Sequence, residues 1–393
     1  MRKVSQNLFN FKQITSDLYH TNESLCRQAT SFKRQQLLHT MPRFISLALI
    51  IPLSTLTVAC SNSETAKQAK EQTIAGDTSQ DSKQAEESSP IIVTKDNFPQ
   101  AYTNMRFDAI IKQAGGINQF KEMGTAPSDP TKQFVVRMNR DTFYSTGVFD
   151  MEGGIDLTIP ETEKYVSTQV VDENHETQPM IYGPGKHKLT AKTKYAFVVV
   201  RSLDDQARKN LKVEANSSDE FIAKEWDTET FEKVAAAGNK IFTEGYDQSK
   251  AYSNKESGQT PYWNYVGAAG GWGGAMVIDN IYQTSQYMSS DGCYQTTFVD
   301  PQARDFWSAT VYNGDGYLFN DFANISSETN PEKNPDESYT LRFGCDGQPN
   351  NIPIREGNKT GKFNVVMRHY GPSEMVKNKK EGYNPTENIE KVK

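Results

Sequence analysis

The spacing of apolar residues changes several times along the chain, and each change marks a different kind of secondary structure. Phe98, Ala101 and Ile110 recur at mostly helical steps, Asn97 can cap a helix before them, and Gly115 can end it. The pattern predicts one amphipathic helix at the start of an ordered chain that begins near residue 91.

From residue 133 the period shortens to that of β-strands, with Gly, Pro or Asp between the runs. Short strands at even spacing favour an antiparallel β-sandwich. The strands expected here are 133–139, 143–149, 155–159, 165–171, 186–190 and 194–200.

Helical spacing returns between residues 204 and 245, where Phe231, Val234 and Ile241 fall on one face. This stretch predicts a small helical connector between two β-rich parts of the chain. The glycine-rich run Gly270–Gly274 is expected to form a backbone corner packed by Trp272.

Strand-like spacing resumes after the glycine-rich run, and Asn313-Gly314 is a strong hairpin signal between two of the runs. A second β-sandwich, jelly-roll-like, fits this spacing best. Its expected strands are 293–299, 305–312, 316–319, 339–344 and 362–370.

The predicted fold class is therefore mainly β, with two antiparallel β-sandwich domains joined by a small helical segment. The first domain, with the N-terminal helix, is expected over 91–213, and the connector over 214–265. The jelly-roll-like domain is expected over 266–390.

Residues 41–59 have the anatomy of a secretory signal peptide: Arg43 near the start, an apolar centre interrupted by Pro52, and small residues before Cys60. The apolar run is too short to span a bilayer as a helix. A cysteine in this place resembles the lipobox of bacterial lipoproteins, although Thr57 stands where that pattern prefers Leu. We expect lipidation at Cys60; the alternative is an ordinary cleaved signal with a chance cysteine.

The residues on either side of this signal are polar. Residues 1–40 resemble neither structured chain nor targeting sequence, so we interpret Met41 as the start and 1–40 as a mis-annotated leader; the alternative is a genuine long leader. Residues 60–90 lack apolar periodicity and predict a flexible tether. The expected location is the cell envelope, with the lipid anchor in the membrane. Because Ser61 is not Asp, the location expected in a Gram-negative host is the periplasmic side of the outer membrane.

Composition excludes several function classes. The formal charge of −6 shows no basic bias, so a nucleic-acid partner is not expected. The spacing of His175, His187 and His369 offers no His-x-His pair, and no Cys-x-x-Cys occurs, so neither a metal site nor another cofactor is predicted. Gly-x-Ser-x-Gly is also absent, so serine-hydrolase chemistry lacks its usual signature.

Beyond Cys60, the mature chain keeps Cys293 and Cys345, which can pair in an oxidising compartment, although sequence does not fix their separation.

Four separated motifs occur together in this chain, and these are Met138–Ser145, Ala269–Gly274, Phe306–Asn313 and Arg368–Pro372. As a set they resemble proteins that pair domain of unknown function 1254 with domain of unknown function 1214. The resemblance covers about residues 95–390. It implies a β-sandwich, a small helical segment and a C-terminal jelly roll, and it implies no established reaction.

The chain departs from the branch that it most resembles in two places. There, two cysteines close the loop before the last strand, whereas here Cys345 fits the first place and Asn351 occupies the second. The resemblance therefore favours Cys293 as the partner of Cys345. A tryptophan usual at the entry of that strand is replaced by Gly361-Lys362-Phe363, which changes the expected shape of any pocket near it.

Two polar clusters are candidates for chemistry. Asn139, Arg140 and Asp141 end a predicted strand beside Tyr144, and an amide, a guanidinium and a carboxylate together can bind a hydroxylated or carboxylated ligand. The alternative is a structural corner, with Asp141 capping a turn and Arg140 in a surface ion pair.

The second cluster closes the last strand, where alternation places Arg368 and Tyr370 on one face and His369 on the other. An inward Arg368 is costly unless paired, so it is either a ligand clamp or part of a core ion pair. Trp307 and Tyr312 can stack on sugar rings if they are exposed, but half of the aromatic residues in alternating strands are core.

Three hypotheses follow. The first is a lipid-anchored envelope protein that binds a small polar or carbohydrate-like ligand in a cleft between its two sandwiches. The second is an enzyme on the same scaffold, with Asp141 as the base and Arg368 holding an anionic group. The third is a structural or partner-binding module, which a large flat apolar patch would favour. The first two require the Asn139–Asp141 segment and Arg368 to converge.

Overall fold

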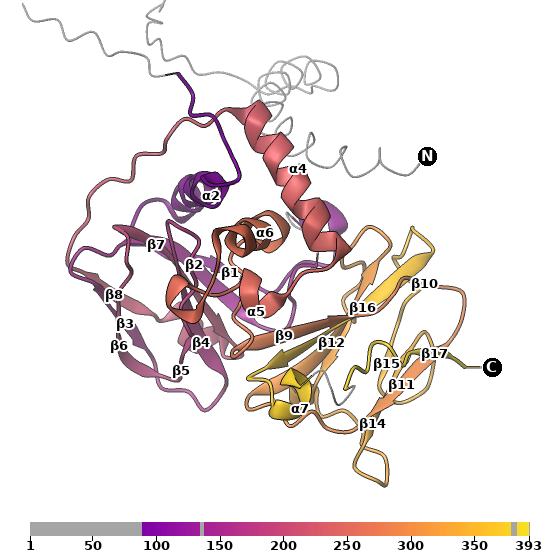
Figure 1. Cartoon of the computed structure of the whole chain (residues 1–393). Helices are drawn as coiled ribbons and strands as arrows, with labels where there is room; N and C mark the ends of the chain where they lie inside the picture. Colours follow the sequence, from indigo (N-terminus) through magenta and orange to yellow (C-terminus); the bar gives the residue numbers. More distant parts are fainter. Residues whose placement is uncertain (1–88, 134–136, 379–382, 393) are drawn as a thin grey trace, which may run out of the picture. The chain divides into compact units, whose positions relative to one another are not determined.

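The computed structural model describes residues 89–133, 137–378 and 383–392, which belong to one compact unit. It contains more strand than helix, with several antiparallel sheets in two regions joined by helices α3–α5 (Figure 1). Three predicted segments lie outside the described residues: the mis-annotated leader at 1–40, the signal peptide at 41–59 and the tether up to residue 88. Within those residues, no helix is long and apolar enough to cross a membrane.

The N-terminal region contains two antiparallel sheets. One has the strand order β1-β2-β7-β4-β5 and the other the order β6-β3-β8. The strands are β1 (Lys121–Met123), β2 (Phe143–Asp150), β3 (Ile155–Ile159), β4 (Val166–Asp172), β5 (Ile181–Tyr182), β6 (Gly185–Leu189), β7 (Tyr195–Ser202) and β8 (Lys212–Ala215).

Alternation along the strands explains why these two sheets pack face to face. In β3, Ile155, Leu157 and Ile159 are buried while the residues between them are half-buried. They pack against Val170 of β4 and Val198 of β7 in one apolar core. Five of the six strands predicted in this part are confirmed to within one or two residues.

The sixth predicted strand, 133–139, is wrong for its described residues, none of which lies in a strand. Arg137 has a φ of 55°, which breaks an extended path, and its N–H donates to the carbonyl of Gly316 in the other region. The Gln133 side chain likewise bonds to the backbone of Leu318. This segment is held by the C-terminal region instead of by its own sheet.

Helices cover the other face of the larger sheet and lead to the second region (Figure 1). The first helix begins and ends where the sequence predicts, although Asn97 bonds back to Ile92 and Thr94 and does not cap the helix. The helices are α2 (Phe98–Ala114), α3 (Asp205–Lys209), α4 (Thr228–Glu244), α5 (Gln248–Ala251), α6 (Pro261–Gly271) and α7 (Glu374–Lys377), with 3₁₀ turns η1 (Pro130–Lys132), η2 (Lys255–Ser257) and η3 (Ser327–Thr329).

Two predictions for this middle part of the chain need correction. The stretch expected to be helical from residue 204 contains strand β8, which pairs with β3. The corner expected over Gly270–Gly274 begins later than predicted, because Gly270 and Gly271 still belong to α6 and the chain leaves the helix only from Trp272, which packs against Phe107 and Phe197. The glycines suit a helix here because α6 packs closely against α4 and α5.

The C-terminal region also contains two sheets. The first has the order β10-β16-β12-β13, with β9 also paired to β16, and the second the order β15-β14-β11-β17, in which β14 and β15 are parallel. The strands are β9 (Asn280–Thr284), β10 (Met288–Ser289), β11 (Tyr294–Phe298), β12 (Phe306–Asn313), β13 (Asn324–Ser326), β14 (Tyr339–Phe343), β15 (Asn351–Ile352), β16 (Lys362–Tyr370) and β17 (Glu390–Lys391).

The two C-terminal sheets enclose one aromatic core, in which Trp307 of β12 packs against Phe298 of β11 and Tyr339 of β14. Strand 316–319 was expected to close a hairpin after Asn313, but it is not a strand. The Asn313 side chain accepts from two following N–H groups and turns the chain, and β13 closes the pair instead. These strand orders show antiparallel sheets and do not by themselves establish a jelly roll.

Cys293 and Cys345 form a disulfide that joins the residue before β11 to the second residue after β14. Asn351, which stands where the related branch has a cysteine, accepts the backbone N–H of Cys345 at 2.7 Å.

Candidate functional site

The two regions meet where the segment from Arg137 to Asp141 lies against strands β12 and β16. The Asp141 carboxylate accepts hydrogen bonds from Ser308 at 2.6 Å, Tyr370 at 2.9 Å and Asn324 at 3.2 Å. One acidic side chain of the N-terminal region therefore holds three positions of the C-terminal region.

Tyr370 joins two residues of this segment. Its hydroxyl accepts from the Asn139 amide at 2.7 Å and donates to Asp141. Burial and the nearby Asp141 charge raise the pKa of Tyr370 well above its ordinary value, so the hydroxyl stays neutral and can donate. Asn139 also accepts the backbone N–H of Asp141, which fixes the turn.

Arg368 lies next to this cluster and is 4% exposed. Its guanidinium donates to Thr310 at 3.1 Å, to the Tyr312 hydroxyl at 2.7 Å and to the Arg137 carbonyl at 3.2 Å. Burial alone would lower the pKa of Arg368, but Tyr312 and Asp141 hold it above its ordinary value. Among the described residues no carboxylate forms an ion pair with Arg368, so the core ion pair considered above is not formed.

The register of the sheet explains this gathering of polar groups. Arg368 lies opposite Ser308 on β12 and opposite Tyr282 on β9, and Tyr370 lies opposite Asn280. Directly opposed residues share a face, so this face of the sheet is polar although it is largely buried. We call it the polar face. His369 points the other way and bonds to Gln283, as alternation predicts.

Arg201 of β7 faces the same interface and was not identified in the sequence. It lies opposite Tyr144 on β2 and Ser167 on β4, and its guanidinium lies 5.5 Å from the Tyr144 ring centre. Burial lowers the pKa of Arg201, but Tyr144, Tyr165 and Tyr282 together raise it above its ordinary value. Arg201 is therefore a cation at neutral pH.

The two regions correspond to two known families. Residues 117–223 match Protein of unknown function (DUF1254), and residues 276–374 match Protein of unknown function (DUF1214). The chain is a DUF1254/DUF1214 protein. The paired resemblance predicted from the four sequence motifs is thereby confirmed.

Solved structures resemble this DUF1254/DUF1214 protein in fold. The VPA0106 protein from Vibrio parahaemolyticus has a TM-score of 0.56 at 14% identity, covering 76% of this chain and 100% of that one. A putative uncharacterized protein from Burkholderia cenocepacia has a TM-score of 0.44 at 12% identity, covering 71% and 84%. No curated protein matches the sequence.

The interface between the DUF1254 and DUF1214 regions leaves buried polar atoms without partners. These include Nη1 of Arg201 and Oδ1 of Asn280, and Arg201 has no ion pair among the described residues. Buried polar atoms in proteins are nearly always bonded to protein, water or ligand. Arg201 follows a run of three valines, and a charged residue ending a buried strand was the only sequence signal for it.

The other candidate residues have structural roles. Trp307 is 1% exposed in the aromatic core of the C-terminal sheets, on the opposite face of β12 from Ser308, so it is a core residue and no stacking platform. Tyr312 is also buried and donates to the Met138 carbonyl. Arg140 pairs with the exposed Asp321 at 3.0 Å, which is the surface ion pair considered as the alternative.

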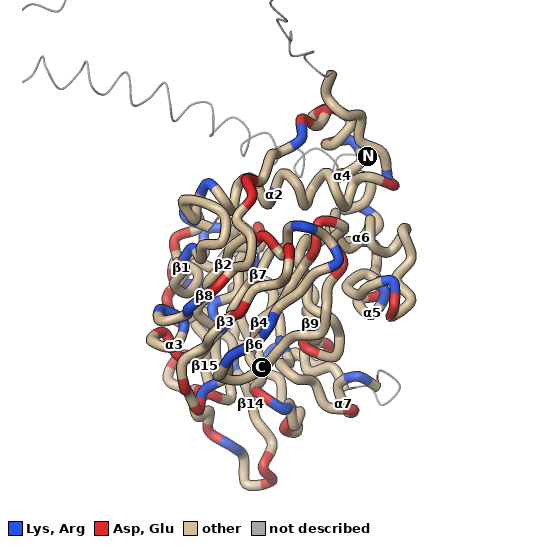
Figure 2. Tube along the Cα trace, turned by 90° about the vertical axis from the view of Figure 1, so that its left-hand side faces the viewer, with Lys and Arg blue, Asp and Glu red and all other residues tan. Residues whose placement is uncertain are grey.

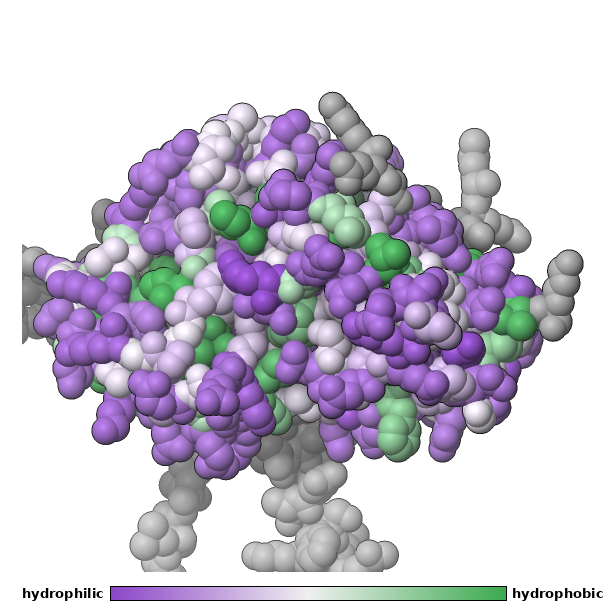
Figure 3. Space-filling model, turned by 90° about the horizontal axis from the view of Figure 1, so that it is seen from below, coloured by the Kyte–Doolittle hydropathy of each residue, from purple (hydrophilic) through white to green (hydrophobic). Residues whose placement is uncertain are grey.

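The described part of the chain contains no group of three or more His, Cys, Asp or Glu side chains that could hold a metal ion. Charged residues of both signs are interspersed over its elements (Figure 2). On the face seen in Figure 3, apolar residues form small groups separated by hydrophilic ones. That face offers no large apolar patch for a protein partner.

Proposed function

We propose that the chain binds a small anionic ligand between its two regions, at Arg201 and the polar face around Arg368. The observation that carries the proposal is the half-buried Arg201 guanidinium, which is positively charged but has a buried, unpartnered Nη1 and no ion pair among the described residues. A charge that is partly removed from water without a partner is costly. A ligand anion would supply the missing charge and the missing hydrogen-bond acceptor.

The charges near the interface support an anion over a neutral ligand. Arg201 and Arg368 contribute two positive charges, and Asp141 contributes one negative charge. Asp279 also lies near Arg201, but its carboxylate accepts hydrogen bonds from the Tyr182 hydroxyl at 2.7 Å and from the Met180 N–H at 3.2 Å, and it forms no ion pair with Arg201 among the described residues. Nη1 of Arg201 therefore remains for a ligand anion. Asn280, beside Asp279, adds an unpartnered acceptor that suits a hydroxyl or protonated group on the ligand.

The acid–base hypothesis lacks a comparable observation. Both oxygens of Asp141 already accept hydrogen bonds from Ser308, Tyr370 and Asn324, so the carboxylate has a structural role between the regions. A general base must instead reach the proton of a substrate. Binding is therefore the better supported function, and the convergence of Asp141 with Arg368 serves to place the two regions.

We also propose a cellular location for the protein and a jelly-roll-like fold for its C-terminal region. The signal anatomy of residues 41–59 supports a lipid anchor at Cys60 and an envelope location. Two facing antiparallel sheets in the C-terminal region are what a jelly-roll-like sandwich would require.

The test measures the melting temperature of the full-length chain with phosphate, acetate and succinate. Binding to the folded state raises the stability by about 2.7 kcal/mol at a hundredfold excess over Kd. At least one anion should raise the melting temperature of the unchanged chain, and Arg201→Met should abolish that rise. Because Arg201→Met removes an unpaired, half-buried charge, its melting temperature without anion should be equal or higher.

Lys112→Gln is the matched control, since it removes an exposed cation of the same charge from α2. It should keep the response to the anion. The proposal is wrong if no anion stabilises the chain, or if Arg201→Met responds as strongly as Lys112→Gln. Should Arg201→Met fail to fold, Arg201→Gln provides the second variant under the same criteria.

A further inference from the structure

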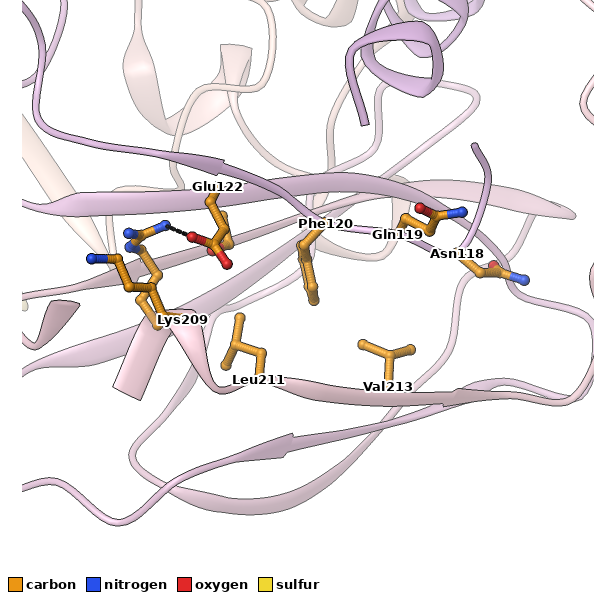
Figure 4. Close-up of a pocket in the computed structure, with 9 residues that line it drawn as sticks. Asn118, Gln119, Phe120, Glu122, Lys209, Leu211 and Val213 are labelled. Atoms are coloured by element: carbon orange, nitrogen blue, oxygen red, sulfur yellow. Dashed lines mark ion pairs between the residues drawn. The ribbon is translucent and has the colours of Figure 1, made fainter. Parts of the chain in front are cut away.

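A separate pocket of about 290 Å³ opens in the DUF1254 region, away from the interface described above (Figure 4). It lies between β1 with its preceding residues and the segment from α3 into β8. Phe120 points into it from one wall, and Leu211 and Val213 point toward it from the other. The volume is at the small end of the range for ligand pockets, roughly 300–1,000 Å³.

The sequence builds this pocket through the register of β1 on β2. Glu122 lies opposite Ser145, so both side chains are on one face of the sheet, and Phe120 lies two residues before Glu122 on the same side. Gly147 lets the backbone at Gln119 approach β2, because a Cβ at Gly147 would overlap the Gln119 carbonyl. The close approach of these two backbone segments therefore fixes one wall of the pocket.

Two cations line one end of the pocket. These are Arg208 and Lys209, which both pair with Asp205 behind the wall, while Glu122 is the one carboxylate that lines the pocket itself. The Arg208 side chain is 3% exposed and makes three hydrogen bonds, two to Asp205 and one to the Tyr144 carbonyl. Two of its five N–H groups are therefore without a hydrogen-bond acceptor among the described residues.

Glu122 shows that a carboxylate can reach Arg208. Its carboxylate lies 3.7 Å from Nη1 of Arg208, and its side chain is 52% exposed (dashed line in Figure 4). Because Glu122 is exposed and 3.7 Å is longer than a hydrogen bond, this contact contributes little to stability and another carboxylate can replace it.

The pocket also contains an unsatisfied hydroxyl. Ser145 is fully buried, lines the pocket, and its Oγ has no hydrogen-bond partner. A buried hydroxyl of this kind calls for a ligand or a bound water. Together with the apolar walls, it describes a ligand that is apolar along its body and has oxygen atoms at one end.

We propose that this pocket binds a small monocarboxylate with an apolar body, whose carboxylate takes the place of Glu122 at Arg208. The apolar body packs between Phe120 and the pair Leu211 and Val213. The Ser145 hydroxyl donates to a carboxylate oxygen or satisfies a bound water beside it. None of these residues belongs to the interface around Arg201, so the two proposals stand or fall separately.

Hexanoate is the probe, and its binding to the full-length chain is measured by ligand-observed NMR titration. We expect saturable binding that strengthens about fourfold for each methylene from butanoate to hexanoate. 1-Hexanol, which lacks the charge, should bind at least tenfold more weakly. Leu211→Trp should fill the slot and abolish binding.

Glu122→Gln gives the sharpest result, because removing the competing carboxylate should tighten hexanoate binding about two- to fivefold and leave 1-hexanol unchanged. Arg201→Met should bind hexanoate as the unchanged chain does. Absence of saturable hexanoate binding overturns the proposal, as does unchanged binding in Leu211→Trp or looser binding in Glu122→Gln. If Leu211→Trp does not fold, Val213→Phe serves under the same criterion.

Discussion

His175 shows how a single side chain can join distant parts of the fold. Its Nδ1 lies 3.0 Å from Oδ1 of Asn264, and its Nε2 accepts the backbone N–H of Gly273 at 2.9 Å. Nδ1 must then carry the proton, so the neutral ring satisfies both contacts. His175 is 1% exposed, and burial lowers its pKa to about 4. The sequence indicated only that this histidine lacks metal-ligand spacing.

This lowered pKa predicts a loss of stability in acid. The unfolded chain takes up a proton on His175 below about pH 6.5, whereas the folded chain does so only near pH 4. Protonation therefore stabilises the unfolded state as the pH falls from 6.5 to 4, and the free energy of unfolding decreases. Between pH 7 and pH 5 the contribution of His175 should fall by about 2 kcal/mol. Denaturant unfolding of the full chain at both pH values measures it.

The matched variant is His175→Asn, because Asn tolerates the φ of 61° found here and cannot be protonated. It should be less stable than the unchanged chain at pH 7, and the gap should narrow at pH 5. Comparing variants at each pH removes the opposite effect of Asp172, whose pKa is raised to about 6 by burial and which favours the folded state in acid. An equal gap at both pH values would contradict the argument.

Helices α4–α6 show where sequence patterns succeed and where they fail. The amphipathic face of α4, with Phe231 and Ala235 buried, was predictable from spacing alone. The helical conformation of the glycines in α6 could not be predicted in this way, because glycine usually interrupts a helix. Here a Cβ at Gly270 would overlap the ring of Phe242, and one at Gly267 would overlap the Ala251 carbonyl. Contacts with partners distant in sequence decide their conformation, and local pattern does not record them.

Gly270→Ala should therefore destabilise the protein even though alanine is the better helix former. The gain in helix propensity is about 1 kcal/mol, while forcing α4 away from α6 costs about 3 kcal/mol, so a net loss of about 2 kcal/mol is expected. Denaturant unfolding measures it. Gly124→Ala is the control, since nothing lies within 4 Å of a Cβ there, and it should be neutral. A stabilised Gly270→Ala would show that the helices can separate without cost.

The two family regions are built as one unit around a shared polar boundary. The sequence predicted that the Asn139–Asp141 segment and Arg368 would converge, and they do, through Tyr370 and Ser308. It could not predict Arg201, because strand spacing assigns a residue to a face but does not say which other region covers that face. The boundary therefore links both families, which suits a binding site that exists only when the two occur together.

The proposed anchor decides where this unit works. Cys60→Ala should remove the acylation site, so the protein should move from the membrane fraction to the soluble fraction. Each buried methylene of an acyl chain contributes about 0.8 kcal/mol to membrane binding, so two or more chains hold a protein stably and none leaves it free. Fractionation after alkaline washing, with incorporation of labelled palmitate, measures both consequences. Ser61→Ala is the control, because it leaves the cysteine in place, and it should stay with the membrane and keep its label. Membrane association of Cys60→Ala would refute lipidation, and the polar run after residue 60 would then have no anchor to tether.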